Sequence, residues 1–237
     1  MKIGIITAMP EETRAILKDA NSEKSVLDNR NCFRCRIGGH DIMLVEAGMG
    51  MLNAGSTATA LAVEGVELLV SAGFGGGVLP GLLVGDVVVA QQVLHWTGSQ
   101  LDLTRPLFYR VKTADPVLTG CFITSNGILN KKDLAGLLPS DIERPVVEME
   151  SAAVAQVAAE QGIHFLGIRA ISDPWDEELN FSIHDFCDQQ MRIRPLKVLA
   201  TTMRRPAIIP QLIRLAKNSR KAAKSLGAAM KQLLAQL

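Results

Sequence analysis

The chain has 237 residues, of which 48% are hydrophobic and only 4% aromatic, so its core is built mainly from Val, Leu, Ile and Ala. This length is enough for one large α/β core or two tightly packed halves. No run of about 18 apolar residues is present, which excludes an ordinary membrane-spanning helix. The first residues read as a strand and not as a signal peptide, so we expect a cytoplasmic location.

The formal net charge of +1 conceals an uneven distribution of charged residues. After Asp188 the chain holds eleven Lys and Arg residues and no acid, so the part before it is net acidic. We therefore expect an acidic body that carries a basic C-terminal segment.

The elements predicted in chain order alternate between strands and helices, which is typical of an α/β fold. Several strands are continuous Val/Ile/Leu runs, as in sheets that are covered on both faces. Gly-Gly-His-Asp at 38–41 predicts a hairpin turn, so the sheet is expected to be mixed. Strands are predicted at 2–7, 31–38, 41–47, 66–72, 86–93, 120–125, near 145–148 and 164–171, and helices at 10–20, 51–64, 151–162, 183–203 and 208–236.

Carboxylates follow three of the predicted strands. Glu11 and Glu12 come after strand 2–7, Glu148 and Glu150 lie at the end of the strand near 145–148, and Asp173 closes strand 164–171. Ligands of parallel α/β sheets bind at the carboxyl ends of the strands. We therefore predict a site where these acids meet.

Two other features leave alternatives open. Cys32 and Cys35 form a Cys-x-x-Cys pair, but their surroundings read as a hairpin strand and no second ligand pair follows, so we expect no metal. Residues 94–118 are irregular and rich in rings. They form either a lid or substrate wall or a hydrophobic satellite cluster. The rings are those of His95, Trp96, Phe108 and Tyr109.

Glycines cluster at 47–50 and 71–77, each after a predicted strand, where a ligand is able to approach the backbone. Neither segment has the dinucleotide-binding fingerprint or the Lys-Ser/Thr of a P-loop.

Taken together, these segments resemble the nucleoside phosphorylase superfamily, in particular the 5′-methylthioadenosine/S-adenosylhomocysteine nucleosidases, over roughly residues 1–187. The most specific stretches are Lys-Ile-Gly-Ile-Ile-Thr-Ala-Met-Pro-Glu-Glu (2–12), Val-Glu-Met-Glu-Ser-Ala-Ala-Val-Ala (147–155) and Arg-Ala-Ile-Ser-Asp (169–173). The resemblance implies a three-layer α/β sandwich with a twisted mixed sheet. It also implies a homodimer whose neighbouring subunit completes the substrate pocket, and it implies no cofactor.

The resemblance also assigns roles in cleaving a purine N-glycosidic bond. The base must leave with a proton, which Asp173 would supply at purine N7 with help from Ser172. Glu12 would activate the attacking water and Arg169 would orient it. Glu150 would bind the ribose hydroxyls, with Met149 beneath the sugar. Around the substrate the resemblance further places Glu148, Met9, Phe74, Gly75, Ile128 and Leu129.

The chain departs from the family pattern at two places that affect the chemistry. Ile128 and Leu129 stand where nucleosidases usually carry an aromatic residue beside the adenine. Ser71 and Phe74 stand where related phosphorylases hold phosphate with an arginine and a serine. A dianion without cations is poorly held. We therefore favour hydrolysis of a 5′-substituted adenosine, such as methylthioadenosine or adenosylhomocysteine, over phosphorolysis.

The basic segment supports an alternative. Residues 204–220 resemble the C-terminal extension of hopanoid-associated nucleoside phosphorylases, which implies phosphorolysis of a lipid-linked adenosine. We divide the chain into a catalytic domain, 1–203, and a basic amphipathic helix, 204–237. Such a helix is typical of an anionic membrane surface, here the inner face, or it packs on a subunit or partner. A non-enzymatic nucleoside- or nucleic-acid-binding protein is a further alternative. It has no need of three carboxylates at strand ends, and we expect no specific nucleic acid partner.

Overall fold

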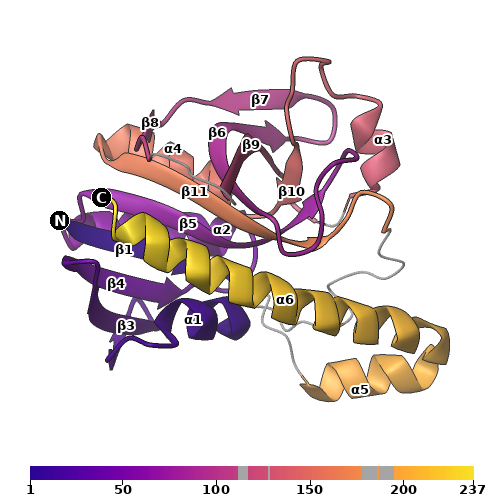
Figure 1. The fold of residues 1–237 in the computed structure, drawn as a ribbon, viewed down its shortest axis with the longest axis horizontal. Coiled ribbons are helices and arrows are strands. Elements are labelled where there is room, and N and C mark those ends of the chain that lie inside the picture. The colour runs from indigo at the N-terminus through magenta and orange to yellow at the C-terminus, as the bar shows by residue number, and fades with distance from the viewer. Residues whose placement is uncertain (112–116, 128, 178–185, 187–194) are drawn as a thin grey trace.

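The computed structural model describes residues 1–111, 117–127, 129–177, 186 and 195–237. Strands and helices alternate along much of the chain, as the sequence predicts (Figure 1). The elements are β1 (Lys2–Thr7), α1 (Pro10–Leu17), β2 (Glu23–Leu27), β3 (Arg30–Ile37), β4 (His40–Glu46), α2 (Met51–Val63), β5 (Leu68–Gly77), β6 (Val87–Trp96), β7 (Leu101–Thr104), β8 (Leu107–Phe108), β9 (Val117–Thr124), α3 (Lys131–Ala135), β10 (Val146–Glu148), α4 (Ser151–Gln161), β11 (His164–Asp173), α5 (Pro195–Arg204), the 3₁₀ turn η2 (Pro206–Ile208) and α6 (Ile209–Leu234).

The strands form one mixed sheet in the order β2-β3-β4-β1-β5-β10-β9-β6-β11-β8. β1 runs parallel to β4 and β5, whereas β2, β3 and β4 form an antiparallel meander. β5 also pairs with β11, which pairs with β6, so β5, β10, β9, β6 and β11 close into a ring. The predicted mixed sheet is confirmed, and its closure into a ring is a feature that the strand pattern alone did not indicate.

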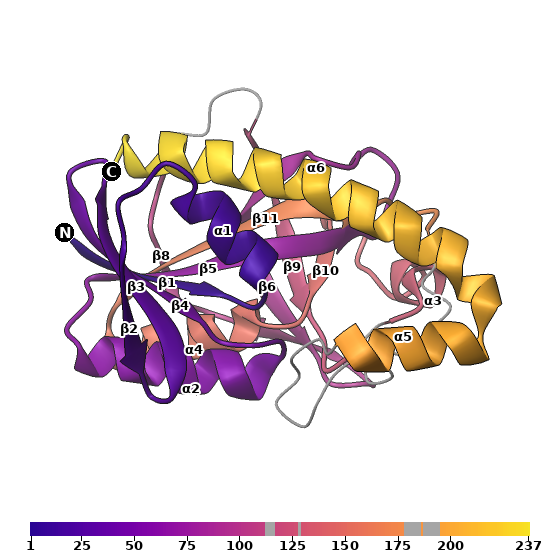
Figure 2. The ribbon, with the colours of Figure 1, turned by 90° about the horizontal axis from the view of Figure 1, so that it is seen from below.

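Helices cover both faces of the sheet, which gives the three layers that the resemblance implied (Figure 2). α2 and α4 pack on one face, where Ala54, Leu61 and Val154 join the larger core cluster. α1 and α6 lie on the other face, where Leu226 and Met230 of α6 are buried in a second cluster. The mixed α/β fold with a long C-terminal helix is therefore confirmed.

The apolar stripe of α6 is covered, over its C-terminal half, by this chain's own β5, β6, β11 and α1. Ala222 and Leu226 are fully buried there, and Gly227 lies so close to α1 that a Cβ atom would stand 2.3 Å from the Ala15 carbonyl oxygen. The N-terminal half of α6 extends with α5 beyond the sheet (Figure 1). Among the described helices, none is long and apolar enough to cross a membrane.

Several short elements escaped the sequence prediction. β2, β7, β8 and α3 were not expected, because their few residues carry too little periodicity to be distinguished from loops. The helix predicted at 183–203 is present from Pro195 to Arg204, and its first part falls largely on residues outside the described ranges.

The rings of the ring-rich segment pack against different parts of the core: Phe108 against the larger cluster, Tyr109 against the second and Trp96 against a third. Phe108 meets Phe165 edge to face with centroids 5.7 Å apart, and Tyr109 meets His164 at 5.6 Å. None of the four rings of this segment is among the described residues that line the cavity discussed below. Both interpretations of the segment therefore stay predictions. Cys32 is buried in β3, and the thiols of Cys32, Cys35 and Cys121 are free.

Candidate active site

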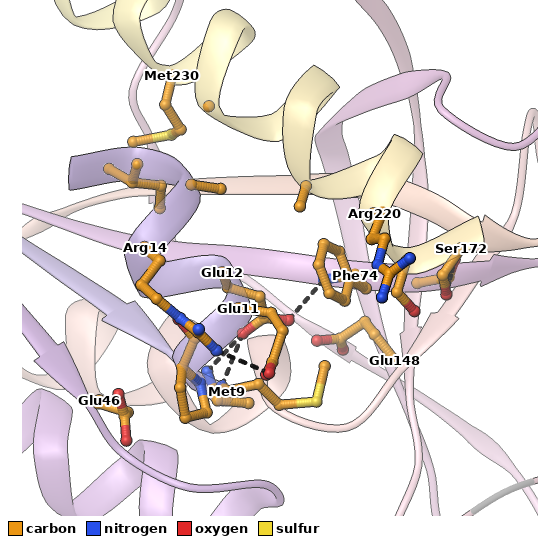
Figure 3. Close-up of a pocket in the computed structure, with 18 of the residues that line it drawn as sticks. Met9, Glu11, Glu12, Arg14, Glu46, Phe74, Glu148, Ser172, Arg220 and Met230 are labelled. Carbon is orange, nitrogen blue, oxygen red and sulfur yellow. Dashed lines mark hydrogen bonds and ion pairs between the residues drawn. The ribbon is translucent and has the colours of Figure 1, made fainter. Parts of the chain in front are cut away.

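The strand ends meet at one cavity of about 1730 Å³. Its walls come from the loop between β1 and α1, the end of β5, the β10–α4 junction, the end of β11 and one side of α6. Figure 3 shows Glu12, Phe74, Glu148 and Ser172 around the same space, with Arg220 of α6 above them. Acids far apart in the sequence therefore lie together, as their positions at strand ends predicted.

Glu12 is held by backbone amides from two segments. Ala8 and Met9 donate N–H groups to Oε2 at 2.8 and 2.9 Å, and Phe74 donates its N–H to Oε1 at 2.8 Å. The side chain is only 2% exposed, and burial raises its pKa although the three amides and Arg169 pull in the other direction. Gly73 makes this arrangement possible, because a Cβ atom there would lie 2.7 Å from Oε1.

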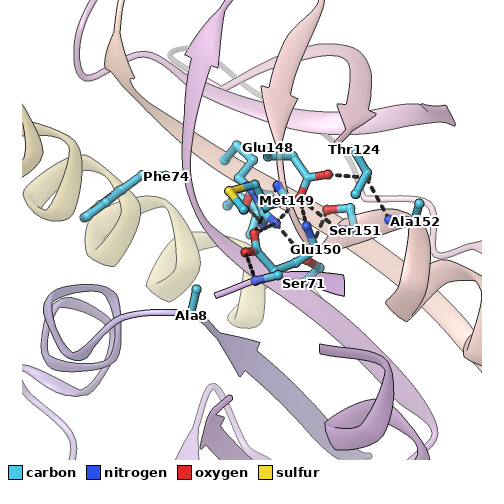
Figure 4. Close-up of polar contacts among 12 residues, drawn as sticks. Ala8, Ser71, Phe74, Thr124, Glu148, Met149, Glu150, Ser151 and Ala152 are labelled. Carbon is cyan, nitrogen blue, oxygen red and sulfur yellow. Dashed lines mark hydrogen bonds and ion pairs between the residues drawn. The ribbon is translucent and has the colours of Figure 1, made fainter. Parts of the chain in front are cut away.

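Glu148 and Arg169 form a buried ion pair at the carboxyl end of β10. Figure 4 shows Glu148 beside Thr124 and the start of α4. Glu148 Oε2 also accepts N–H groups from Glu150 at 3.1 Å and Ser151 at 2.8 Å, and Thr124 donates its hydroxyl to Oε1. Burial alone would raise the pKa of Glu148, but Arg169 and these donors outweigh it and the pKa is lowered. Glu148 is therefore a fixed anion that caps the start of α4.

Glu150 lies beside this pair in a different electrostatic environment. Its Oε1 accepts the Gly50 N–H at 2.9 Å, and its Oε2 lies 3.4 Å from the Arg169 guanidinium. Burial and the neighbouring Glu148 charge raise the pKa of Glu150 to about 7, against the opposing effects of Arg169 and the Gly50 amide. Gly50 has a φ of 94°, a conformation that favours glycine. The side chain of Glu150 thus changes charge near neutral pH.

Asp173 ends β11 after a register shift in its pairing with β5, and both its carboxyl oxygens are engaged. Ser172 donates its hydroxyl to Oδ1 at 2.7 Å. The Lys131 ammonium contacts Oδ2 and also donates to the carbonyl oxygens of Asp173 and Pro174 at 3.3 and 2.8 Å. Asp173 is therefore a buried carboxyl group with a cation directly behind it.

The apolar part of the cavity contains most of the predicted substrate-binding residues. Met9, Phe74, Gly75, Met149 and Leu129 all contribute to the lining. Gly75 has no room for a side chain, since a Cβ atom would lie 2.5 Å from a methyl carbon of Val146. The prediction for Ile128 falls outside the described residues.

Arg169 is placed differently from the other predicted site residues. It is 1% exposed and contacts Ser71, Glu148 and Glu150, and it is not among the described residues that line the cavity. Its predicted contact with water remains a prediction.

Sequence reasoning missed Lys131 and Thr124. Lys131 follows Asn130, whose side chain accepts the Lys132 and Asp133 amides as an N-cap, so the pattern Asn-x-x-Asp was the available signal for α3. Nothing in the sequence pairs this helix with the end of β11.

Comparison with known proteins finds relatives over most of the chain. The Phosphorylase superfamily model matches residues 2–116 and 109–204. A 5′-methylthioadenosine/S-adenosylhomocysteine nucleosidase of Geobacillus sp. (strain WCH70) is 33% identical over 217 residues, which cover 79% of this chain and 92% of the relative. The Listeria welshimeri nucleosidase is 31% identical over 220 residues, 78% of this chain and 92% of its own.

Solved structures share the fold at lower identity. The Helicobacter pylori 5′-methylthioadenosine/S-adenosylhomocysteine nucleosidase superposes with a TM-score of 0.72 at 18% identity, covering 100% of this chain and 99% of the other. The futalosine hydrolase of the same species gives a TM-score of 0.72 at 19% identity, with 100% and 98% coverage. From the matched family model and the curated relatives, the chain belongs to the phosphorylase superfamily and is a nucleosidase or nucleoside phosphorylase-type enzyme.

Proposed function

We propose that this enzyme hydrolyses the N-glycosidic bond of a 5′-substituted adenine nucleoside. The observation that carries the proposal is a pair of carboxyl groups in one cavity whose electrostatic surroundings differ. Glu12 is held by backbone amides and has a raised pKa, whereas Asp173 is backed by a cation. Bond cleavage needs both a group that accepts a proton from water and a group that supplies one to the base.

The remaining roles follow from position. Glu12 accepts the proton of the attacking water, and Asp173 with Ser172 serves the departing base at N7. Glu150 accepts the ribose hydroxyls, and Met149 packs beneath the sugar. Arg169 orients the attacking water through the acids that it contacts, because its guanidinium holds Glu148 and Glu150. The nucleosidases in the comparison support adenine as the base.

The charge balance at the strand ends favours water over phosphate. Arg169 is already paired with Glu148 and Glu150, and Lys131 is paired with Asp173. Glu12 adds a further carboxyl group beside Phe74. A phosphate dianion would approach these carboxyl groups while Arg169 and Lys131 are already neutralised by them, which is unfavourable.

Product analysis tests the proposal directly. The protein is incubated with 5′-methylthioadenosine in buffers with and without inorganic phosphate, and adenine and the sugar product are identified. Hydrolysis gives free methylthioribose at the same rate in both buffers. A sugar 1-phosphate formed strictly in the presence of phosphate would refute it, and release of no base from any adenosine derivative would refute the enzyme class.

A second candidate is phosphorolysis of a lipid-linked adenosine. The observation in its favour is the cavity, which continues from the site along α6, past apolar residues and past Arg220 and Lys224. A nucleoside alone does not need this space, so a long 5′ substituent fits the extension. The apolar lining there is formed by Leu212, Leu215, Ala216, Ala223 and Ala228. The same product analysis with an adenosine carrying a 5′ alkyl chain decides between the candidates.

A homodimer is part of the proposal. Leu52 and Val63 of α2 are 92% and 85% exposed, which is unusual for large apolar side chains on one helix. A second copy of the chain would cover this face of α2. Sedimentation equilibrium tests the dimer, with the wild type compared with a Leu52→Glu variant. If the wild type sediments as a monomer, as the variant does, the dimer is contradicted.

A further inference from the structure

Lys131 occupies an unusual position for a lysine. It is 4% exposed, and its ammonium donates to three oxygens, which are Oδ2 and the carbonyl of Asp173 and the carbonyl of Pro174. An ammonium has three N–H donors, so all of them are used. Lys131 is not among the described cavity-lining residues, whereas Asp173 is. Any effect of Lys131 on a ligand must therefore pass through Asp173.

The fold leaves space for this pair. A Cβ atom at Gly76 would lie 2.5 Å from Asp173 Oδ2 and 3.1 Å from Lys131 Nζ. The glycine at the end of β5 thus permits the carboxyl group and the ammonium to meet against the strand. Burying two charges costs free energy, and the packing of α3 against the end of β11 does not need a buried ion pair. A function for the pair accounts for that cost better than stability does.

We propose that Lys131 is the positioning residue of the proton donor, and that the proton taken by the departing base is held by the Lys131–Asp173 pair and not by Asp173 alone. This inference rests on the proposed N-glycosidic cleavage. Ser172 fixes one carboxyl oxygen and Lys131 the other, so the carboxyl plane is set before the substrate arrives. Among the described donors to the Asp173 carboxyl group, the Lys131 ammonium is the charged one.

The proton balance of the step is complete. The bond between C1′ and N9 breaks and its electron pair enters the purine, while a proton passes from the Lys131–Asp173 pair to purine N7. The oxygen of water bonds to C1′ and a proton of that water goes to Glu12. Solvent then carries one proton from Glu12 back to the pair, so that the net change is addition of one water.

A double-mutant cycle tests the inference. Lys131→Met, which keeps the length of the side chain without its charge, is compared with Asp173→Asn and with the double variant, using adenine release from 5′-methylthioadenosine. Each single variant is expected to lose about 10²–10⁴-fold in turnover, the usual contribution of general acid catalysis. The double variant should lose no more than the more impaired single variant, because residues that act as a unit are not additive. Lys132→Met, on the exposed neighbour, is the matched control and should retain turnover.

Binding separates this role from a general structural one. The dissociation constant of an uncleavable adenine C-nucleoside should change far less than turnover in Lys131→Met, whereas a collapsed site would lose both together. Wild-type turnover in Lys131→Met, or losses that multiply in the double variant, would overturn the inference while leaving the proposed function intact. A wild-type protein that releases no adenine would instead overturn the proposed function.

Discussion

Replacing Glu12 by Gln isolates the carboxyl group on which the proposed hydrolysis depends. In the structure its two oxygens accept three backbone N–H groups, from Ala8, Met9 and Phe74. A glutamine has one acceptor oxygen and one NH₂ group, so it retains the two bonds to Ala8 and Met9 or the one to Phe74. At least one buried amide is left facing another donor, which costs about 1–3 kcal/mol.

A second effect opposes this loss. Burial raises the pKa of Glu12, which means that the fold disfavours its ionised form, and a neutral glutamine removes that penalty. The net change in the free energy of unfolding should therefore be smaller than the lost hydrogen bond suggests. We expect a fall in Tm of at most about 2–4 °C per kcal/mol lost for a chain of this size. Turnover should fall by about 10²–10⁴-fold, because the amide is no base.

Two measurements on the same preparation check this reasoning. Calorimetry gives Tm, and adenine release from 5′-methylthioadenosine gives turnover, each beside Glu11→Gln as the matched control. Glu11 is adjacent, exposed and paired with an exposed Arg14, a contact worth about 0–1 kcal/mol. Its variant should resemble the wild type in Tm and should lose far less turnover than Glu12→Gln. A Glu12→Gln protein with more than about a tenth of wild-type turnover would refute the assigned role, since that lies outside the range for a lost general base.

Three further outcomes are expected. Because Glu150 has a pKa of about 7, the affinity for an uncleavable adenine C-nucleoside should fall as pH drops below 7, by up to about tenfold per unit. The free energy of unfolding should show the opposite trend and fall as pH rises from 4.5 to 7. Both trends should vanish in Glu150→Gln, and an unchanged pH profile in that variant would contradict the assignment. Gly73→Ala should impair turnover because its Cβ atom would lie 2.7 Å from Glu12 Oε1, whereas Gly55→Ala, with its nearest neighbour at 3.5 Å, should not; equal activity of the two variants would argue against the placement of Glu12. If the α5–α6 hairpin meets an anionic membrane, the protein should co-sediment with anionic vesicles at low salt and dissociate as salt rises, with each cation such as Arg204 contributing about 1 kcal/mol; no sedimentation at low salt would end that hypothesis.

The sequence determined the class of fold and the edge at which the site forms. Continuous apolar runs predicted buried strands, and acids directly after three of them predicted Glu12, Glu150 and Asp173 at one edge. For Glu12 and Asp173 this succeeded because β1, β5 and β11 run parallel, and the carboxyl ends of parallel strands share an edge. β10 runs antiparallel to β5, so the presence of Glu150 in the same cavity does not follow from this rule. The hairpin turn at 38–41 likewise predicted a mixed sheet from local conformation alone.

Tertiary structure decided how these groups are charged and what stands behind them. The difference between Glu148, with a lowered pKa, and Glu150, with a raised one, depends on which carboxylate receives Arg169 and the donors at the start of α4. Lys131 reaches Asp173 from 42 positions away along the chain. The cover of α6 was equally hidden, because a basic amphipathic stripe fits a membrane, a subunit or a sheet. Packing with distant strands distinguishes these cases, and a local pattern carries no information about such contacts.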